Sequence, residues 1–214
     1  MEIRWYGLGC FRLSERGYPV VVTDPFSEDE AGLSLPRGGV DVVTSSALID
    51  DYRSASWPGL RGVTRTVASP GEYEIGGTFI TSVAATGSEE PGSIVSDSVV
   101  HAINYDGVVV CHLGALTRTP TQSQVEAIGR VDVLLIPVGI PGTSPAVTSE
   151  TISLIEPDIV VPMHYEVPGL KLDRLPVTGF LKEMGIAQPT LVPVLKVTAG
   201  SKPEEIQIIL LEPQ

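Results

Sequence analysis

Cys111-His112-Leu113-Gly114-Ala115 and Pro162-Met163-His164-Tyr165 are the two stretches of sequence that decide the fold. Each overlaps or follows a short apolar run, at residues 108–112 and 159–162, and short apolar runs bounded by turn residues are typical of buried strands. A third such run, at residues 131–137, lies between them. Because helical patterns separate these runs, we expect strands and helices to alternate in the second half of the chain.

Short strands dominate the first half, where apolar runs alternate closely with Gly and Pro turns. Helix signals are found in the second half, such as a capping box formed by Thr121 and Gln124. The expected strands are residues 2–6, 10–13, 18–23, 40–44, 61–67, 72–75, 78–83, 96–104, 108–112, 131–137, 159–162, 191–197 and 205–211, and the expected helices are residues 121–129, 148–156 and 176–184. This order predicts two sheets covered by helices in one domain, residues 1–214, because no segment is long enough to be a linker.

The composition indicates an acidic globular protein. Of the 214 residues, 43% are hydrophobic and 19% are charged, which excludes a disordered chain. The formal net charge of −12 argues against nucleic acid as a partner, since phosphate backbones bind clustered Lys and Arg. The longest apolar stretch, residues 131–140, is too short to span a bilayer, so we expect no membrane association. Without a signal-peptide pattern, and with two cysteines read as buried thiols, the chain is expected to be cytoplasmic.

Six segments in fixed order carry a family resemblance: Tyr6-Gly7-Leu8-Gly9-Cys10-Phe11, Asp24-Pro25-Phe26, Pro70-Gly71-Glu72-Tyr73-Glu74, Cys111-His112-Leu113-Gly114, residues 131–139 and residues 157–165. Together they resemble the metallo-β-lactamase superfamily, most closely its branch of small, zinc-dependent, L-ascorbate-6-phosphate-lactonase-like hydrolases. The resemblance extends over nearly the whole chain. It implies an α/β fold, a four-layer αββα sandwich, with a metal site at one edge built from loops at strand ends.

The chain departs from the family at most positions that hold metal in the resembling proteins. His164 is the one ligand position that keeps its residue. Leu8 replaces another histidine of the family, and none is present near residues 86–87. In the family pattern His-x-His-x-Asp-His, the ligand positions are occupied here by Ser45, Ala47, Ile49 and Asp50. Ala115 occupies the position of the bridging Asp that follows His-Leu-Gly in the family.

These replacements predict a protein that keeps the fold of the superfamily but has lost metal-dependent catalysis. A catalytic zinc needs at least three protein ligands, and one retained imidazole gives no useful affinity. Ala115 also removes a carboxylate that would cost on the order of several kcal/mol if buried without its cation. We therefore expect a degenerate site with no metal and no cofactor, in a pseudoenzyme that binds a small-molecule ligand or a protein partner. We also expect a homo-oligomer, because relatives in the resembling branch assemble.

Two catalytic alternatives remain open. The first is metal-independent hydrolysis of an ester or lactone, in which Asp50 and His164 activate water and Ser45 or Ser46 is a nucleophile. The second is a hydrolase that binds zinc or manganese through rearranged ligands around His164. The carboxylates that would supply such a site are Asp24, Asp50 and Glu72.

The same residues also have structural explanations. We expect His164 to be a hydrogen-bonded pocket histidine, and His112, at the end of a strand, to bond a backbone carbonyl. His101 lies in an alternating strand and is expected to be exposed or half-buried. Asp24 and Glu72 are expected to bond loop backbone.

Overall fold

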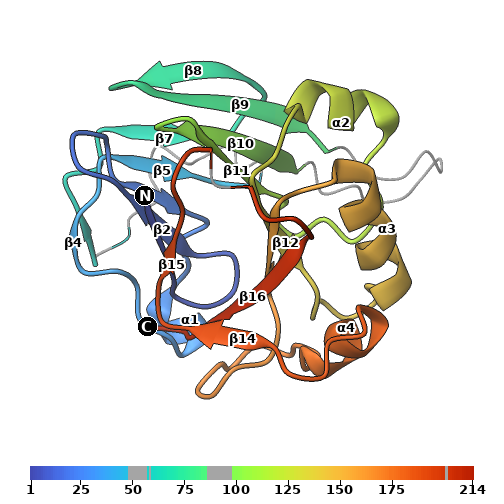
Figure 1. Ribbon diagram of the computed structural model, residues 1–214. Coiled ribbons are helices and arrows are strands. Elements are labelled where there is room, and N and C mark those ends of the chain that lie inside the picture. Colours follow the sequence, from blue (N-terminus) through green and yellow to red (C-terminus); the bar gives the residue numbers. More distant parts are fainter. Residues whose placement is uncertain (48–56, 58, 86–97, 201) are drawn as a thin grey trace, which may run out of the picture.

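The structure, a computed structural model, describes residues 1–47, 57, 59–85, 98–200 and 202–214 (Figure 1). Two mixed β-sheets pack face to face, and helices α2 (Gln122–Ile128), α3 (Pro145–Ile155) and α4 (Thr178–Glu183) lie along the outer face of the larger sheet (Figure 1). On the side of the smaller sheet, the described residues contain one short helix, α1 (Glu28–Ala31). This arrangement is the αββα sandwich expected from the sequence.

Both sheets contain parallel and antiparallel strands. The smaller sheet has six strands, in the order β15 (Leu195–Lys196), β1 (Glu2–Trp5), β2 (Phe11–Ser14), β3 (Val21–Thr23), β5 (Val42–Thr44) and β7 (Arg65–Val67). The larger sheet has eight strands, in the order β14 (Thr190–Val192), β16 (Gln207–Leu211), β13 (Ile159–Met163), β12 (Val133–Pro137), β11 (Val108–His112), β10 (Val99–Tyr105), β9 (Thr78–Ala84) and β8 (Gly71–Ile75). A separate pair joins β4 (Gly38–Gly39) to β6 (Leu60–Arg61).

The main apolar core lies between the two sheets and includes buried side chains from both. Strands β1 and β2 alternate between inward and outward side chains, and Trp5 and Phe11 face each other across them with no exposed surface. The Trp5 ring also packs on Tyr165, with ring centroids 4.8 Å apart, and its Nε1 donates to the Leu8 carbonyl at 2.9 Å. Trp5 therefore links the core to two loops at the edge of the sandwich.

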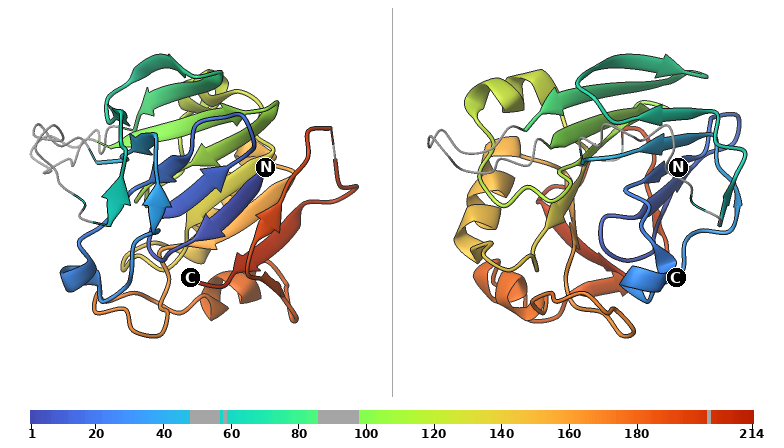
Figure 2. Two further views of the ribbon diagram at one scale, coloured as in Figure 1. Left: turned by 90° about the vertical axis from the view of Figure 1, so that its left-hand side faces the viewer. Right: turned by 180° about the vertical axis from the view of Figure 1, so that it is seen from behind.

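Parallel strands bring loops that are distant in sequence to that edge. Strand β3 runs parallel to β5, with Thr23 opposite Thr44, and β11, β12 and β13 are parallel to one another. Because parallel strands end at the same edge of a sheet, the loops after β3 and β5 meet, as do those after β11 and β13. The His112 ring nitrogen Nε2 lies 2.8 Å from the Gly9 carbonyl oxygen, so the two sheets end at a common edge (Figure 2).

Three elements differ clearly from the expected ones. Residues 61–67, expected as one strand, are divided between β6, which pairs with β4, and β7, which pairs with β5. Residues 191–197, expected as one strand, form two strands in different sheets, since β14 pairs with β16 and β15 pairs with β1. Pro193 lies between them and lacks the N–H that a continuous ladder would use. Helix α3 begins earlier than expected, because Ser144 caps it and Pro145 suits its first turn. No helix within the described ranges has both the length and the apolar character needed to cross a membrane.

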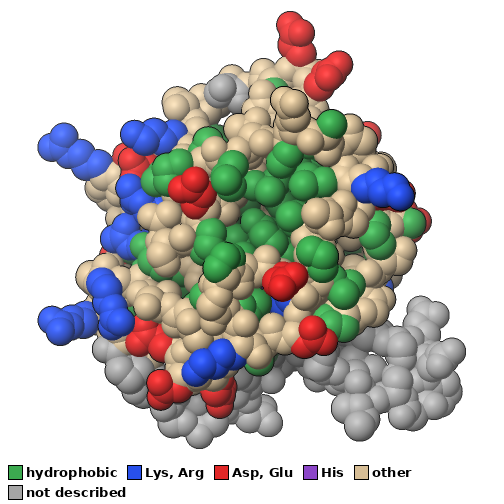
Figure 3. Space-filling view, turned by 90° about the horizontal axis from the view of Figure 1, so that it is seen from below, with side chains coloured by type: hydrophobic (Ala, Val, Ile, Leu, Met, Phe, Trp, Pro, Cys, Tyr) green, Lys and Arg blue, Asp and Glu red, His purple; other side chains and the backbone are tan. Residues whose placement is uncertain are grey.

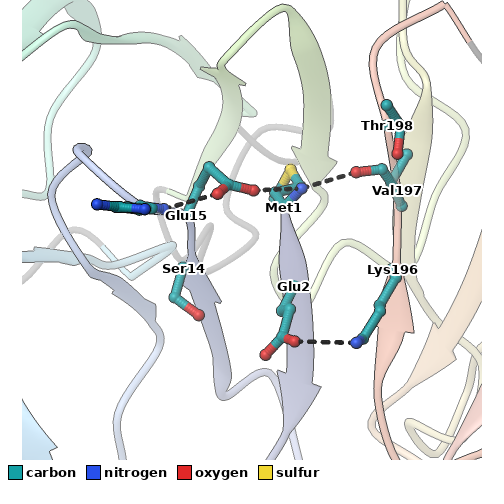
Figure 4. Close-up of a pocket in the computed structure, with 8 residues that line it drawn as sticks. Met1, Glu2, Ser14, Glu15, Lys196, Val197 and Thr198 are labelled. Carbon is teal, nitrogen blue, oxygen red and sulfur yellow. Dashed lines mark hydrogen bonds and ion pairs between the residues drawn. The ribbon is translucent and has the colours of Figure 1, made fainter.

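Charged groups tie the start of β1 to the edge strand β15. The Met1 amino group donates to the Val197 carbonyl at 2.7 Å and forms an ion pair with Glu15 at 2.8 Å (Figure 4). Glu2 and Lys196 form a second ion pair across the same strands at 3.4 Å. These residues line a pocket of about 420 Å³ at the end of β1 away from the common edge. Because most charges in it pair with one another, we assign this pocket a structural role.

Candidate active site

Asp24, at the end of β3, is held by Ser46, which follows the neighbouring parallel strand β5. Asp24 Oδ1 accepts a hydrogen bond from the Ser46 backbone N at 2.6 Å, and Oδ2 accepts one from Ser46 Oγ at 2.5 Å. Hydrogen bonds to a carboxylate are roughly twice as strong as neutral ones. Asp24 thus bonds loop backbone as expected, and each of its oxygens keeps a lone pair for a further donor or a cation.

His164, at the end of β13, presents an imidazole that lacks the hydrogen bonds expected from the sequence. The residue is 8% exposed, and neither Nδ1 nor Nε2 has a partner among the described residues. Burial lowers the pKa of His164 to about 3, against the opposing effect of the Asp24 charge, so the ring is neutral near pH 7. A buried polar group without a partner costs roughly 1–3 kcal/mol, which indicates that a ligand completes its bonding.

Gly9 keeps a small space open between these two side chains. A Cβ atom at position 9 would lie 2.9 Å from His164 Nε2 and 3.0 Å from Asp24 Oδ2. The imidazole nitrogen and the carboxylate oxygen therefore border the same small volume. Glycine suits this position because any side chain would contact both polar atoms.

Backbone strain is concentrated around the same volume. Leu8, Asp24 and His164 all have positive φ angles, of 48°, 38° and 57°, in the left-handed region that non-glycine residues rarely adopt. The Leu8 carbonyl accepts hydrogen bonds from Trp5 Nε1 at 2.9 Å and from the His164 backbone N at 3.3 Å, which helps to hold this geometry. Left-handed backbone costs roughly 1–2 kcal/mol for each such residue, and clusters of strained residues are typical of functional sites.

His112 is fixed beside the Asp24–His164 pair by bonds at both ring nitrogens, one of which is the expected bond to a backbone carbonyl. Its Nε2 donates to the Gly9 carbonyl at 2.8 Å, and its Nδ1 accepts from the Gly114 backbone N at 3.1 Å. The Nδ1 atom also lies 3.9 Å from Asp24 Oδ2. Because both nitrogens are already bonded, His112 supports the site by packing and leaves the free imidazole to His164.

His101 is fully buried, which corrects the expectation of an exposed or half-buried strand residue. Strand β10 lies inside the larger sheet, between β9 and β11, so its inward side chains are covered. His101 Nε2 donates to the Ser45 carbonyl at 2.8 Å, and Nδ1 accepts from Ser82 Oγ at 2.9 Å. Burial is the main reason that the pKa of His101 is lowered to about 4.

This buried histidine predicts acid sensitivity. As the pH falls, His101 takes up a proton near pH 6.5 in the unfolded chain but only near pH 4 in the folded chain, so folding stability is lost between these values. The expected loss from His101 is about 3 kcal/mol. Urea unfolding at several pH values would measure it. The substitution His101→Gln should give a shallower pH dependence, and equal slopes for the two proteins would contradict the assignment.

Within the described part of the chain, none of the hydrogen bonds or strand pairs of Ser45, Ala47 and Ala115 joins them to the His164 imidazole. Ser45 is buried, and its Oγ lies 3.3 Å from both the N and the O of Ala47, a local turn contact. It is Ser46, the neighbouring serine, whose hydroxyl meets a carboxylate. Ala47 is exposed and forms an isolated bridge with Ser98. Ala115 is exposed as well.

Neither of the remaining acidic candidates, Asp50 and Glu72, is placed at the site by the described residues. Asp50, a candidate for activating water, and Ile49 lie outside the described residues. Glu72 is exposed on β8 opposite Thr81, and this row of the sheet continues through Ala102 to Cys111. His112 is one position further along β11 and points to the other face. The structure therefore does not bring Glu72 to the site.

The described residues fit a divalent ion through two donors. The unpartnered His164 nitrogen and the Asp24 carboxylate border a space that a single Cβ atom would fill. A catalytic zinc takes three protein ligands, and within the described ranges no group of three His, Cys, Asp or Glu is close enough to hold one. The pair therefore offers two of the three protein donors that a catalytic zinc takes.

Comparison with known proteins establishes the family. Residues 2–164 match the family described as the β-lactamase superfamily domain. The chain belongs to the metallo-β-lactamase superfamily. A Thermotoga maritima protein of known structure, assigned to the zinc-dependent hydrolases of this superfamily, is 31% identical with a TM-score of 0.76, over 98% of this chain and 97% of that one. The resemblance to the superfamily and the αββα fold are therefore confirmed.

Two further relatives of this superfamily member differ in what their names say about function. A UPF0173 protein of Pyrococcus furiosus is 29% identical, over 77% of this chain and 83% of its own. A UPF0173 metal-dependent hydrolase of Methanopyrus kandleri is 24% identical, over 100% of this chain and 97% of its own.

These relatives correct the function expected from the sequence. The prediction of a non-catalytic pseudoenzyme without metal or cofactor is wrong, because several relatives are named metal-dependent hydrolases and the Thermotoga maritima protein is assigned to the zinc-dependent ones. The alternative, a hydrolase, agrees better with them. The error came from equating lost ligand positions with lost chemistry, although Asp24 and His164 still border an open space across Gly9.

Proposed function

We propose that this chain is a metal-dependent hydrolase of a small ester or lactone, and that its reaction takes place where His164 and Asp24 meet across Gly9. The observation that carries the proposal is the buried His164 imidazole, whose two nitrogens have no partner among the described residues. The names of the relatives support hydrolysis and metal dependence. The ester or lactone bond follows from the resemblance to lactonase-like hydrolases.

His164 and Asp24 are the donors that would hold the ion. The neutral His164 ring offers a nitrogen lone pair, and Ser46 orients the Asp24 carboxylate through two hydrogen bonds. A divalent ion held there would polarise the substrate carbonyl and lower the pKa of a bound water. A zinc site needs a third protein ligand, for which Asp50 is the acidic candidate that the sequence offers.

Metal analysis combined with hydrolysis assays tests the proposal. The protein would be expressed with zinc, manganese and iron supplied, desalted, and analysed for bound metal by elemental mass spectrometry. Hydrolysis of a panel of esters and lactones would be measured with and without a chelator. We expect bound metal and chelator-sensitive hydrolysis, and a loss of roughly 100-fold or more in kcat/KM for His164→Ala and for Asp24→Asn, because each removes a donor to the ion.

Glu72→Gln is the matched control, since it removes an exposed carboxylate outside the site and should leave metal content and activity unchanged. Full activity in His164→Ala would remove His164 from the reaction. Hydrolysis that survives the chelator but is lost in His164→Ala would replace this proposal with a metal-independent one. Failure of the metal-loaded protein to hydrolyse any member of the panel would overturn it.

A further inference from the structure

A loop next to the proposed active site, residues 166–174, is held in place at its base and near its middle. At the base, the Glu166 backbone N donates to the Leu175 carbonyl at 3.0 Å. Further along, the Lys171 backbone N donates to the carbonyl of Ala31 in α1 at 2.9 Å. These hydrogen bonds anchor a loop that follows β13 directly.

The loop lines an open pocket of about 490 Å³, formed by residues that are consecutive or nearly so in sequence. Small-molecule sites typically have volumes of roughly 300–1,000 Å³. Val167, Leu170 and Leu172 contribute apolar surface to a lining that is mostly polar, and Arg174 is its basic residue. Its volume and lining therefore suit part of a small organic molecule.

Arg174 is incompletely bonded for a guanidinium. Its Nε is buried without a hydrogen-bond partner, and its Nη1 donates to the Asp173 carbonyl at 2.7 Å. No ion pair joins it to a carboxylate within the part of the chain that the structure describes. Burial lowers the pKa of Arg174, but an arginine keeps its charge in proteins. Part of a positive charge is thus removed from water without a compensating anion, an arrangement that an oxyanion would complete.

Two acidic residues, Glu166 and Asp173, line the same pocket but do not neutralise Arg174. Both are exposed, and neither carboxylate lies within ion-pair distance of the guanidinium. Exposed charges are screened by water and salt, whereas the half-buried Arg174 is screened less. The Asp173 charge opposes the lowering of the Arg174 pKa, but no ion pair joins the two side chains, so the guanidinium can still bind a further anion.

Arg174 also lies close to the His164 side of the active site. The carbonyl oxygens of His164 and Leu175 both lie within 2.7 Å of the position that a Cβ atom on Gly139 would take, so the chain next to Arg174 runs beside His164. Consistent with this, the Arg174 charge contributes to the lowering of the His164 pKa. Arg174 and His164 therefore lie on neighbouring segments of the chain.

The surface around the loop is apolar. Leu172 and Leu175 of the loop region and Leu191 of β14 are large hydrophobic residues exposed by 41%, 44% and 54%. In the view from below, hydrophobic side chains gather at the centre of this face and most charged side chains lie nearer its rim (Figure 3). An organic body attached to an anion would find apolar contacts here.

From these observations we infer that Arg174 binds an oxyanion of the substrate, a carboxylate or a phosphate, while the ester or lactone bond lies at His164 and Asp24. The inference rests on the proposed function and narrows its substrate class to anionic esters or lactones. Arg174 is thereby a specificity-determining residue. Its planar guanidinium presents paired N–H donors that match the oxygens of either anion.

Three nitrophenyl esters that share the same leaving group test the inference on the metal-loaded protein. They are a neutral acetate, a glutarate half-ester with a free carboxylate, and an ester with a quaternary ammonium group. We expect the anionic ester to be preferred. In Arg174→Gln, the ratio of kcat/KM for the anionic ester to that for the neutral ester should fall roughly 10- to 100-fold, mainly through KM. Competition by inorganic phosphate and by free glutarate separates the two kinds of oxyanion.

Arg65→Gln is the matched control. Arg65 is exposed on β7, and its Nη1 also donates to the preceding carbonyl, at 2.9 Å, so the substitution removes the same charge and a similar bond away from the loop. The ester ratio should not change in this variant. An unchanged ratio in Arg174→Gln, or a preference of the wild-type protein for the cationic ester, would overturn the inference while the hydrolase proposal stands.

A direct binding measurement separates the two proposals. Should the protein hydrolyse none of these esters, calorimetric titration with glutarate and with inorganic phosphate still tests the anion site. Binding by the wild-type protein that is lost in Arg174→Gln would support the site even though the hydrolase proposal has failed. If neither glutarate nor inorganic phosphate binds to the wild-type protein, the inference is overturned.

Discussion

Gly9→Ala is expected to reduce kcat/KM by roughly 100-fold or more, although it adds a single methyl group. The added Cβ would lie 2.9 Å from His164 Nε2 and 3.0 Å from Asp24 Oδ2, so both polar atoms must move apart or lose the space between them. That space is where we propose that a metal ion or its water binds. A displacement of about 1 Å from the productive geometry is enough to cost roughly two orders of magnitude in rate.

The backbone should accept this substitution, which makes it a test of the site more than of the fold. Gly9 does not have a left-handed φ angle, so alanine introduces no backbone strain of its own. The two nearest atoms, His164 Nε2 and Asp24 Oδ2, are side-chain ends, which move more easily than backbone, and the third is the Asp24 Cβ at 3.3 Å. Unfolding in urea should therefore change by no more than about 1 kcal/mol while activity and bound metal are lost.

Gly39→Ala provides the matched control, since a Cβ at that position meets nothing within 4 Å and its φ angle is also outside the left-handed region. This variant should keep the activity and the metal content of the wild-type protein. Steady-state hydrolysis, elemental analysis and urea unfolding would be measured on all three proteins. Wild-type activity in Gly9→Ala would show that the space between His164 and Asp24 takes no part in the reaction.

The sequence predicted the scaffold well, because the scaffold depends on local patterns. The apolar runs at residues 108–112, 131–137 and 159–162 correspond to β11, β12 and β13, and the capping box predicted α2 correctly. The failure at residues 191–197 has a long-range cause. One apolar run supplies a strand to each sheet, and partner choice depends on which edges lie nearby, which no local pattern encodes.

The candidate site was harder to predict because its key features, the unpartnered His164 nitrogens and the space beside Gly9, depend on three-dimensional packing. His164 was singled out by the resemblance, but its unpartnered nitrogens depend on which groups surround it in three dimensions. The role of Gly9 likewise follows from the approach of two loops, one after β3 and one after β13. One signal was present in the sequence: Asp24 follows a strand within a segment that resembles the family. Its pairing with Ser46 becomes visible only when β3 and β5 are known to be parallel neighbours.

Gly139→Ala should destabilise the folded protein by about 3 kcal/mol, near the upper end for overpacking. Its Cβ would lie 2.5 Å from the Leu175 carbonyl oxygen, 2.5 Å from the Tyr165 Cα and 2.7 Å from the His164 carbonyl oxygen. All three atoms belong to the backbone, so no side chain can rotate out of the way. Gly139 also accepts a hydrogen bond from the Leu175 backbone N at 2.7 Å, which separation of the chains would weaken.

The location of Gly139 connects this loss of stability to the active site. Relief of the contacts requires the segment after β13 to move away from the loop after β12, and His164 lies on that segment. Urea unfolding of Gly139→Ala, with Gly39→Ala as the open-space control, would measure the energetic cost. Unfolding free energies that agree within experimental error would mean that His164 and Leu175 can separate freely. In that case the fixed geometry that we assign to His164 and Arg174 would have no structural basis, because both residues depend on this close packing for their positions relative to each other.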